Sequence, residues 1–201
     1  MPGLETVKKV AEKLTGWSRP AKRDLPALIR ERKARTLRFR DDGIIPNHPR
    51  WPVIIYRGVV RLGDEFDPAA VLEDLFAGNG WGDSWRNGIY DYVHYHSRIH
   101  EVLGIARGSG KIQFGGNRGR ALTLNTGDVA ILPAGTGHKK LTASQDFSVV
   151  GAYPPSGTYD ECTTSEDHDR AVKAIPTVRR PPKDPVFGGK GPLLNAWKAF
   201  R

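Results

Sequence analysis

The pattern of hydrophobic positions predicts a chain built mainly from short β-strands. Beyond Gly88, apolar residues come in short runs separated by glycine-bearing turns. The seven strands predicted there span residues 89–96, 101–106, 111–114, 121–124, 129–132, 138–142 and 147–153. A further short buried strand is predicted at 53–56, where the sequence reads Val-Ile-Ile-Tyr. Strands at this spacing favour a β-sandwich or β-barrel fold.

Helical periodicity is confined to a few segments. Near the N-terminus, one helical face is formed by Val7, Val10, Ala11 and Leu14. A second helix-prone run begins at Asp24 and contains Leu28 and Ile29. In the tail after Pro154, which is rich in proline, glycine and charge, a brief helix is predicted only near residues 169–175.

One helix is clearly signalled at both ends. Asp67 is a good N-cap residue, Pro68 suits the first helical position, and Gly78 suits the C-terminal stop. Its apolar face is predicted to be Val71, Leu72, Leu75 and Phe76.

These patterns divide the chain into three predicted parts. A basic helical N-terminal extension covers residues 1–35, a β-barrel covers 36–160, and an irregular segment that straps the barrel covers 161–201. A chain of 201 residues has room for one domain with a sizeable core. Because no internal repeat of useful length occurs, two barrels formed by duplication are excluded.

Composition and charge narrow the class of protein. There is no long apolar run, no secretory signal pattern and only one cysteine, so we expect a cytoplasmic protein that is not in the membrane. Its net charge of +9 is uneven: residues 1–40 carry +8, residues 168–201 carry +6, and the middle carries −5. Because the basic excess lies at the two ends, without a basic stripe interleaved with aromatics or a nucleic-acid-binding motif, nucleic acid is not the expected partner.

The candidate chemistry lies in two short β segments. His94 and His96 are two residues apart, so in an extended strand both imidazoles point to the same face. A tight turn then brings Glu101 back on the neighbouring strand, and His138 follows a glycine-rich turn at 133–137. Three imidazoles and one carboxylate form a donor set for a first-row divalent metal, and they leave up to two octahedral positions open.

The spacing of these residues resembles the two motifs of the cupin family. Gly88, His94-x-His96, Glu101 and Gly108 stand at the intervals of the first motif. The second motif is matched by Gly127, Pro133-x-Gly135 and His138, and it departs only at Thr142, where asparagine is usual. The region from about residue 39 to 160 also resembles uncharacterised bacterial single-domain cupins.

The resemblance implies a single cupin β-barrel, which is a double-stranded β-helix or jelly roll. It implies one divalent transition metal ion, iron, manganese, nickel, copper, cobalt or zinc, held by His94, His96, Glu101 and His138. It also implies a homodimer. His100 is an alternative ligand if the turn before Glu101 has a different register, but strand alternation places it on the opposite face, where it would be a surface residue or a support for a ligand.

Four further residues are candidates for a pocket around the metal. Tyr90 and Tyr92 share the strand phase of the histidines, so we expect them to face the barrel interior, where they either shape a pocket or fill the barrel. Arg86 either binds a carboxylate substrate or forms a surface salt bridge, the latter being favoured. Trp85, with Trp81 nearby, either forms an aromatic lid or seals a barrel end.

Together these features predict a metal-binding cupin acting on a small polar molecule. The favoured function is a metal-dependent oxidoreductase resembling a dioxygenase. Two alternatives remain open: a metal-assisted isomerase or lyase using the same ligands, and a non-catalytic binding or sensor protein. The fold alone does not separate them.

Overall fold

A computed structural model of the chain describes residues 18–198. In chain order its elements are α2 (Leu25–Leu28), β1 (Arg35–Leu37), β2 (Val53–Tyr56), α3 (Pro68–Gly78), β3 (Gly82–Asn87), β4 (Glu101–Arg107), β5 (Ser109–Phe114), β6 (Arg120–Asn125), β7 (Val129–Leu132), β8 (His138–Ala143), β9 (Ser148–Tyr153), α4 (Ser165–Ala174), the 3-10 helix η1 (Ile175–Thr177) and α5 (Pro192–Ala196). Among these residues, no helix is long and apolar enough to cross a membrane.

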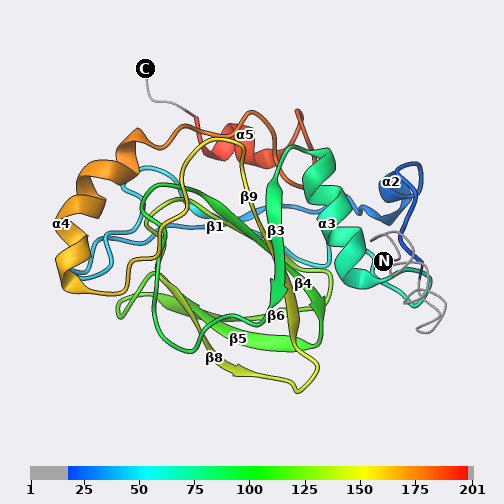
Figure 1. The fold of residues 1–201 in the computed structure, drawn as a ribbon, viewed down its shortest axis with the longest axis horizontal. Helices are drawn as coiled ribbons and strands as arrows, with labels where there is room; N and C mark the ends of the chain where they lie inside the picture. The colour runs from blue at the N-terminus through cyan, green and yellow to red at the C-terminus, as the bar shows by residue number, and fades with distance from the viewer. Residues whose placement is uncertain (1–17, 199–201) are drawn as a thin grey trace, which may run out of the picture.

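The strands form two antiparallel sheets (Figure 1). One has six strands in the order β1-β2-β7-β4-β9-β3, and the other has three in the order β6-β5-β8. Most neighbouring strands in the larger sheet are distant in sequence, so the chain passes repeatedly between the two sheets. This arrangement is the jelly roll that the sequence predicts, and the all-β fold class is confirmed.

The inner strands of the larger sheet, β2, β7, β4 and β9, are buried on both faces, because each face packs against a different core. In β4, Leu103 and Ile105 point to the core between the sheets, as predicted, whereas Val102 and Ala106 point to the outer face. The same alternation explains why β2 reads as an unbroken apolar run: both faces of that strand are covered. The apolar residues of the inner core do not extend to the end of the jelly roll near Glu101, where the buried side chains are polar.

Helix α3 covers part of the outer face. It begins where the sequence predicts, with the Asp67 carboxylate accepting a hydrogen bond from the backbone N–H of Ala69. Its predicted apolar face is buried in the outer core. Gly104 on β4 allows this approach, because a Cβ there would lie only 2.9 Å from the Phe76 ring and 3.0 Å from the Leu72 side chain.

One predicted strand is absent around the start of the first motif, and one strand forms there that was not predicted. Residues 89–96 do not form a regular strand; their bridges are the isolated pairs His94 with His138 and Tyr95 with Cys162. Instead the chain forms β3 earlier, where no strand is predicted, and β3 pairs with β9. Its sequence, Gly-Asp-Ser-Trp-Arg-Asn, lacks apolar alternation, so only pairing with another strand reveals it as β.

The two ends of the chain differ in how they relate to the jelly roll. The helix predicted over residues 7–14 lies outside the described residues, and the second predicted run is the single turn α2. At the other end, α4 is longer than predicted and begins with a capping box between Thr164 and Asp167. Further on, Leu193 and Trp197 are fully buried in the outer core, so the C-terminal segment is an integral part of the packing.

Candidate metal centre

Three buried histidines form the centre of the candidate site. His94, His96 and His138 each offer a ring nitrogen, and these atoms lie within 4.8 Å of one another. The backbones of His94 and His138 form an isolated antiparallel bridge with two hydrogen bonds, of 3.3 and 3.0 Å. The turn before His138 is tied to the same segment, because the N–H of Gly135 donates to the carbonyl of His96 at 2.7 Å. The cluster fits a metal site.

Main-chain carbonyls select the tautomer of these rings. Nδ1 of His138 lies 3.1 Å from the carbonyl of Thr136, and Nδ1 of His96 contacts the carbonyl of Asp160. Nδ1 of His94 lies 3.5 Å from the carbonyl of Tyr92, a longer contact. A carbonyl only accepts hydrogen bonds, so these contacts favour a proton on Nδ1 and a lone pair on Nε2. This is the tautomer of a histidine that binds a metal through Nε2.

Glu101 opens β4 beside the histidines. Its side chain is buried, and Oε2 lies 3.5 Å from Nε2 of His96 and 3.4 Å from Nε2 of His138. Burial by itself would raise the pKa of Glu101, but the neighbouring His96 and His138 lower it below its usual range. Oε2 has no hydrogen-bond partner among the described residues, although unsatisfied buried carboxylate oxygens are costly. An anionic oxygen in this position suits a bound cation.

The histidines differ in their affinity for protons. Burial lowers the pKa of His94 to about 3, helped by repulsion from His138 and His96. Burial also acts to lower the pKa of His96, but the Glu101 carboxylate outweighs it and raises that pKa to about 9. The site therefore attracts positive charge next to Glu101. The donor set and its charge fit a divalent transition metal ion.

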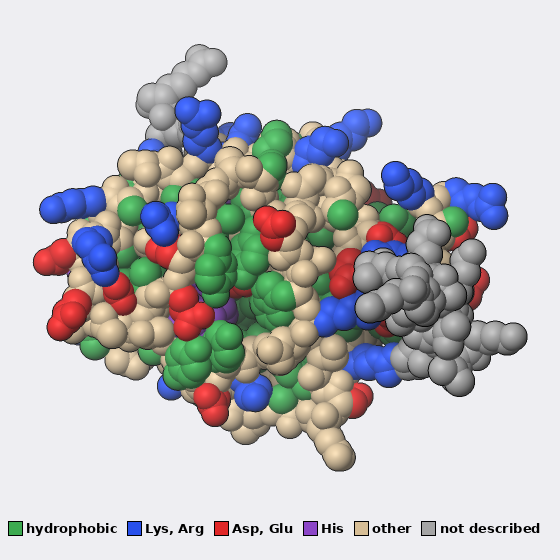
Figure 2. Space-filling view, in the orientation of Figure 1, with side chains coloured by type: hydrophobic (Ala, Val, Ile, Leu, Met, Phe, Trp, Pro, Cys, Tyr) green, Lys and Arg blue, Asp and Glu red, His purple; other side chains and the backbone are tan. Residues whose placement is uncertain are grey.

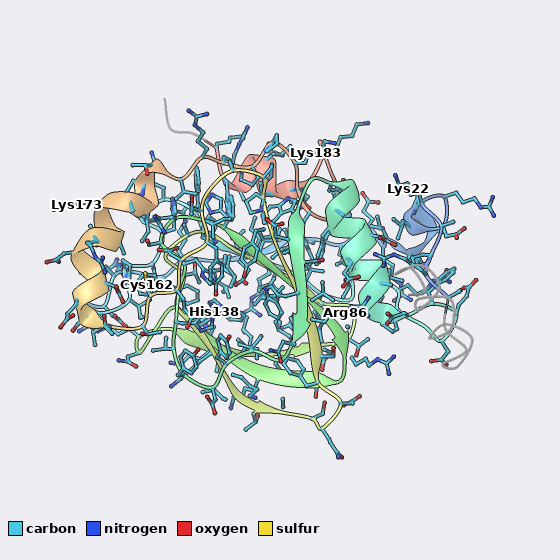
Figure 3. All side chains as sticks on the ribbon, in the orientation of Figure 1. Lys22, Arg86, His138, Cys162, Lys173 and Lys183 are labelled. Carbon is cyan, nitrogen blue, oxygen red and sulfur yellow. The ribbon has the colours of Figure 1, made fainter. Side chains whose placement is uncertain are left out.

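A cavity of about 340 Å³ opens from the histidines toward the surface. The residues that line it are Trp85, Arg86, Asn87, Gly88, Ile89, Tyr90, His94, His96, Glu101, Leu103, His138, Tyr153 and Tyr159. In Figure 2, histidine is visible at the bottom of a hollow framed by side chains of the hydrophobic class, which includes tyrosine. Figure 3 shows His138 in the middle of the fold and Arg86 near α3.

The two tyrosines predicted to face the barrel interior lie instead at its mouth. Tyr90 is 45% exposed and Tyr92 is 44% exposed, and their rings stack at 4.8 Å. Only Tyr90 lines the cavity, whereas the Tyr92 hydroxyl donates to Glu161 at 3.0 Å. The prediction fails because this segment is not a regular strand, so strand alternation does not extend back from His94.

The other two pocket candidates have defined partners. The Arg86 guanidinium bonds to Glu73 at 2.6 and 2.8 Å and to Asp67 at 2.7 Å, which is the salt bridge favoured over carboxylate binding. Trp85 lines the cavity, and its indole N–H donates to the Tyr153 hydroxyl at 3.0 Å.

His100 is neither grouped with the other histidines nor on the surface. It is fully buried, its Nδ1 accepts from the N–H of Ala134 at 2.9 Å, and its Nε2 lies 3.2 Å from the carbonyl of Arg179. Its ring packs against Trp197 at 4.8 Å and Trp51 at 5.5 Å. Strand alternation correctly placed it opposite Glu101, but the outer face is covered by the C-terminal segment, so the surface assignment is wrong.

Three residues of the site escaped the sequence reasoning. Tyr153 and Tyr159 line the cavity, and Asp160 supplies the carbonyl that holds His96. Tyr153 ends a predicted strand, but Tyr159 and Asp160 lie in a loop with no local pattern. The inward phase of β9 was the one signal that pointed to Tyr153.

The chain is similar to one bacterial protein along nearly all of that protein's length. It is 41% identical over 168 residues to the uncharacterized protein YjlB of Bacillus subtilis (strain 168), which covers 83% of this chain and 98% of the relative. The chain belongs to the YjlB family. A scan against protein-family descriptions finds no match. Because YjlB is itself uncharacterized, membership brings no activity with it.

Among solved structures, similarity is limited to parts of the fold. The WlaRB TDP-quinovose 3,4-ketoisomerase of Campylobacter jejuni is 16% identical, with a TM-score of 0.36 over 45% of this chain and 73% of the enzyme. The acireductone dioxygenase of Bacillus anthracis, solved with cadmium in its active centre, is 21% identical, with a TM-score of 0.30 over 43% of this chain and 59% of the enzyme. Similarity at this level carries no activity across to the YjlB family.

Proposed function

We propose that the protein binds one divalent transition metal ion through His94, His96, Glu101 and His138 and acts as a dioxygenase-like oxidoreductase on a small molecule. The observation that carries the proposal is the arrangement of the histidine rings around Glu101. Nε2 atoms of two histidines flank the unpartnered Oε2 of Glu101, while main-chain carbonyls hold Nδ1 on the far side of each ring.

The chain's own residues provide binding, charge balance and access. With an ion bound, the three imidazoles would act as neutral donors, and Glu101 would offset part of the charge of the ion. A bound ion would supply a Lewis-acid centre with positions left for small-molecule ligands. Tyr90, which is both exposed and part of the cavity lining, connects the site with solvent. This opening supports turnover over the alternative of a sealed, non-catalytic binding protein.

The metal proposal is tested by elemental mass spectrometry on protein purified without a histidine tag or chelator. We expect near-stoichiometric metal in the wild type and its loss in His96→Ala. The matched control is His168→Ala, because His168 is a histidine on α4 outside the cavity lining and should not affect metal content. No metal in the wild type, even after incubation with the six candidate ions, would refute the metal centre.

Oxygen uptake separates the reaction classes once the metal is known. A dioxygenase consumes dioxygen in proportion to substrate, whereas a metal-assisted isomerase or lyase converts substrate without it. We further propose a homodimer, which light scattering coupled to size-exclusion chromatography measures directly. A mass of one chain across the working concentration range would contradict that part of the proposal.

A further inference from the structure

Among the described residues that line the cavity outside the metal centre, no cation is free to pair with an anionic ligand. Apart from the histidines, Arg86 is the cation among the described residues that line the cavity. Its guanidinium already pairs with the carboxylates of Asp67 and Glu73. A buried carboxylate or phosphate needs a cationic partner of its own to replace its hydration. Arg86 is therefore poorly placed to serve a third anion.

A carboxylate, that of Glu161, lies beside the tyrosines at the mouth of the cavity. Glu161 accepts hydrogen bonds from the hydroxyl of Tyr92 at 3.0 Å and from the hydroxyl of Tyr159 at 3.2 Å. An anion entering beside Tyr159 would approach a carboxylate, whereas an uncharged molecule would not be repelled.

Aromatic rings form the walls between this rim and the histidines. The Tyr90 ring meets His94 edge-on at 5.1 Å, and the Tyr159 ring lies 5.0 Å from His96. Tyr153 packs edge-on against Tyr159 at 5.6 Å. Aromatic side chains present flat apolar faces and polarised edges, which favour a flat ring as ligand. A volume of about 340 Å³ is near the lower end for ligand pockets and suits one substituted ring.

We infer that this pocket takes a small, flat, uncharged molecule with hydroxyl groups on adjacent carbons, such as a catechol or cyclic enediol, in preference to a carboxylate or phosphate of similar size. The requirement for two adjacent hydroxyl groups rests on the proposed metal centre. Four protein donors leave two positions of an octahedral ion open, and one hydroxyl oxygen could occupy each. The preference for an uncharged ring rests on the walls and rim alone. Because such a molecule is uncharged, the Glu161 carboxylate does not repel it, and its hydroxyl oxygens can face the histidines.

Isothermal titration calorimetry with catechol and benzoate at neutral pH tests the inference. The two probes have the same ring size, and only benzoate is charged. Zinc-loaded protein is used because zinc is redox-inactive, and metal-free protein is titrated in parallel. We expect catechol to bind at least about 10-fold more tightly than benzoate to the metal-free protein, a difference of about 1.4 kcal/mol, and we expect zinc to increase the affinity for catechol.

Variants assign the effect to the pocket. Tyr159→Ala should weaken catechol binding by about 5- to 10-fold through loss of an aromatic wall, whereas Leu141→Ala, an exposed residue on β8, should leave it unchanged. If benzoate binds as tightly as catechol or more tightly, and this binding is lost in Arg86→Gln, the inference is overturned. Zinc uptake by the same protein would still support the metal centre. If the chain takes up no zinc but still prefers catechol, the metal centre fails and the preference for an uncharged ring survives.

Discussion

The backbone carbonyl of Asp160 holds Nδ1 of His96, although 64 residues separate them in sequence. The carboxylate of the same residue accepts hydrogen bonds from the N–H and hydroxyl of Ser97, at 2.9 and 2.5 Å, and from the N–H of Arg98 at 3.1 Å. One residue of the loop after β9 thus orients a histidine ring and fixes the turn that leads from His96 to Glu101. Its position couples the C-terminal loop to the candidate metal centre.

Replacing Asp160 with alanine should weaken metal binding without removing a ligand. The backbone carbonyl remains, but the anchors to Ser97 and Arg98 are lost, so the His96 ring is held less firmly. Losing such a supporting contact typically lowers metal affinity by about 10- to 100-fold. Competition against a chelator measures this change, with Asp169→Ala, whose side chain is 95% exposed, as the control. Equal affinity in both variants would show that Asp160 does not organise the site.

The comparison of Asp160 with His94 explains what sequence could and could not predict. His94 and His96 could be paired from local geometry, because a two-residue interval places both rings on one side of extended backbone. Asp160 and Tyr159 could not, because their roles depend on where a loop without periodicity packs after nine strands have formed. The strand β3 has no apolar alternation to reveal it, and strand alternation misplaces Tyr90 and Tyr92 because residues 89–96 do not form a regular strand.

Replacing His100 with alanine should lower stability but preserve metal stoichiometry. The change leaves a cavity beside Trp51 and Trp197 and removes the hydrogen-bond partner of the Ala134 N–H. Together these losses should cost about 2 to 4 kcal/mol of unfolding free energy. Urea unfolding and elemental analysis at saturating metal measure the two quantities. A stoichiometric loss of metal from folded His100→Ala protein would identify His100 as a ligand after all.

The indole of Trp85 occupies the space over Gly151, its paired residue on β9. A Cβ at Gly151 would overlap the indole ring, so glycine is needed for Trp85 to line the cavity. Gly151→Ala should therefore destabilise the protein by about 1 to 3 kcal/mol through overpacking. In a Trp85→Ala background the same change should cost much less. Denaturant unfolding of both single variants and the double variant tests this, and additive effects would contradict it.

Trp197 should be required for stability even though it lies four residues from the C-terminus. Its ring stacks on Trp51 at 5.4 Å, and its indole N–H donates to the carbonyl of Pro52 at 2.8 Å. Trp197→Ala should reduce the free energy of unfolding by about 3 to 5 kcal/mol, as for other large buried aromatics. Lys190→Ala, an exposed change in the same segment, is the control. Equal stability of the two variants would mean that the C-terminal segment is dispensable for the core.

His168 on α4 should make stability depend on pH through its contact with Asp41. Nε2 of His168 lies 2.9 Å from both oxygens of that carboxylate, and the resulting hydrogen bond raises the pKa of His168 above its usual value. A raised pKa in the folded state means that the contribution is fully present below about pH 6.5, the unperturbed histidine value, and is lost as pH rises through the folded pKa.

The contact is near the surface, so its contribution should be small, at most about 0.5 kcal/mol. His168→Gln should lower the melting temperature at about pH 6 and have less effect at about pH 9, because the imidazole loses its proton as the pH rises. Val172→Ala, on an exposed position of the same helix, should cause a deficit that does not vary with pH. If the His168→Gln deficit is the same at both values, packing rather than charge joins α4 to the loop that carries Asp41.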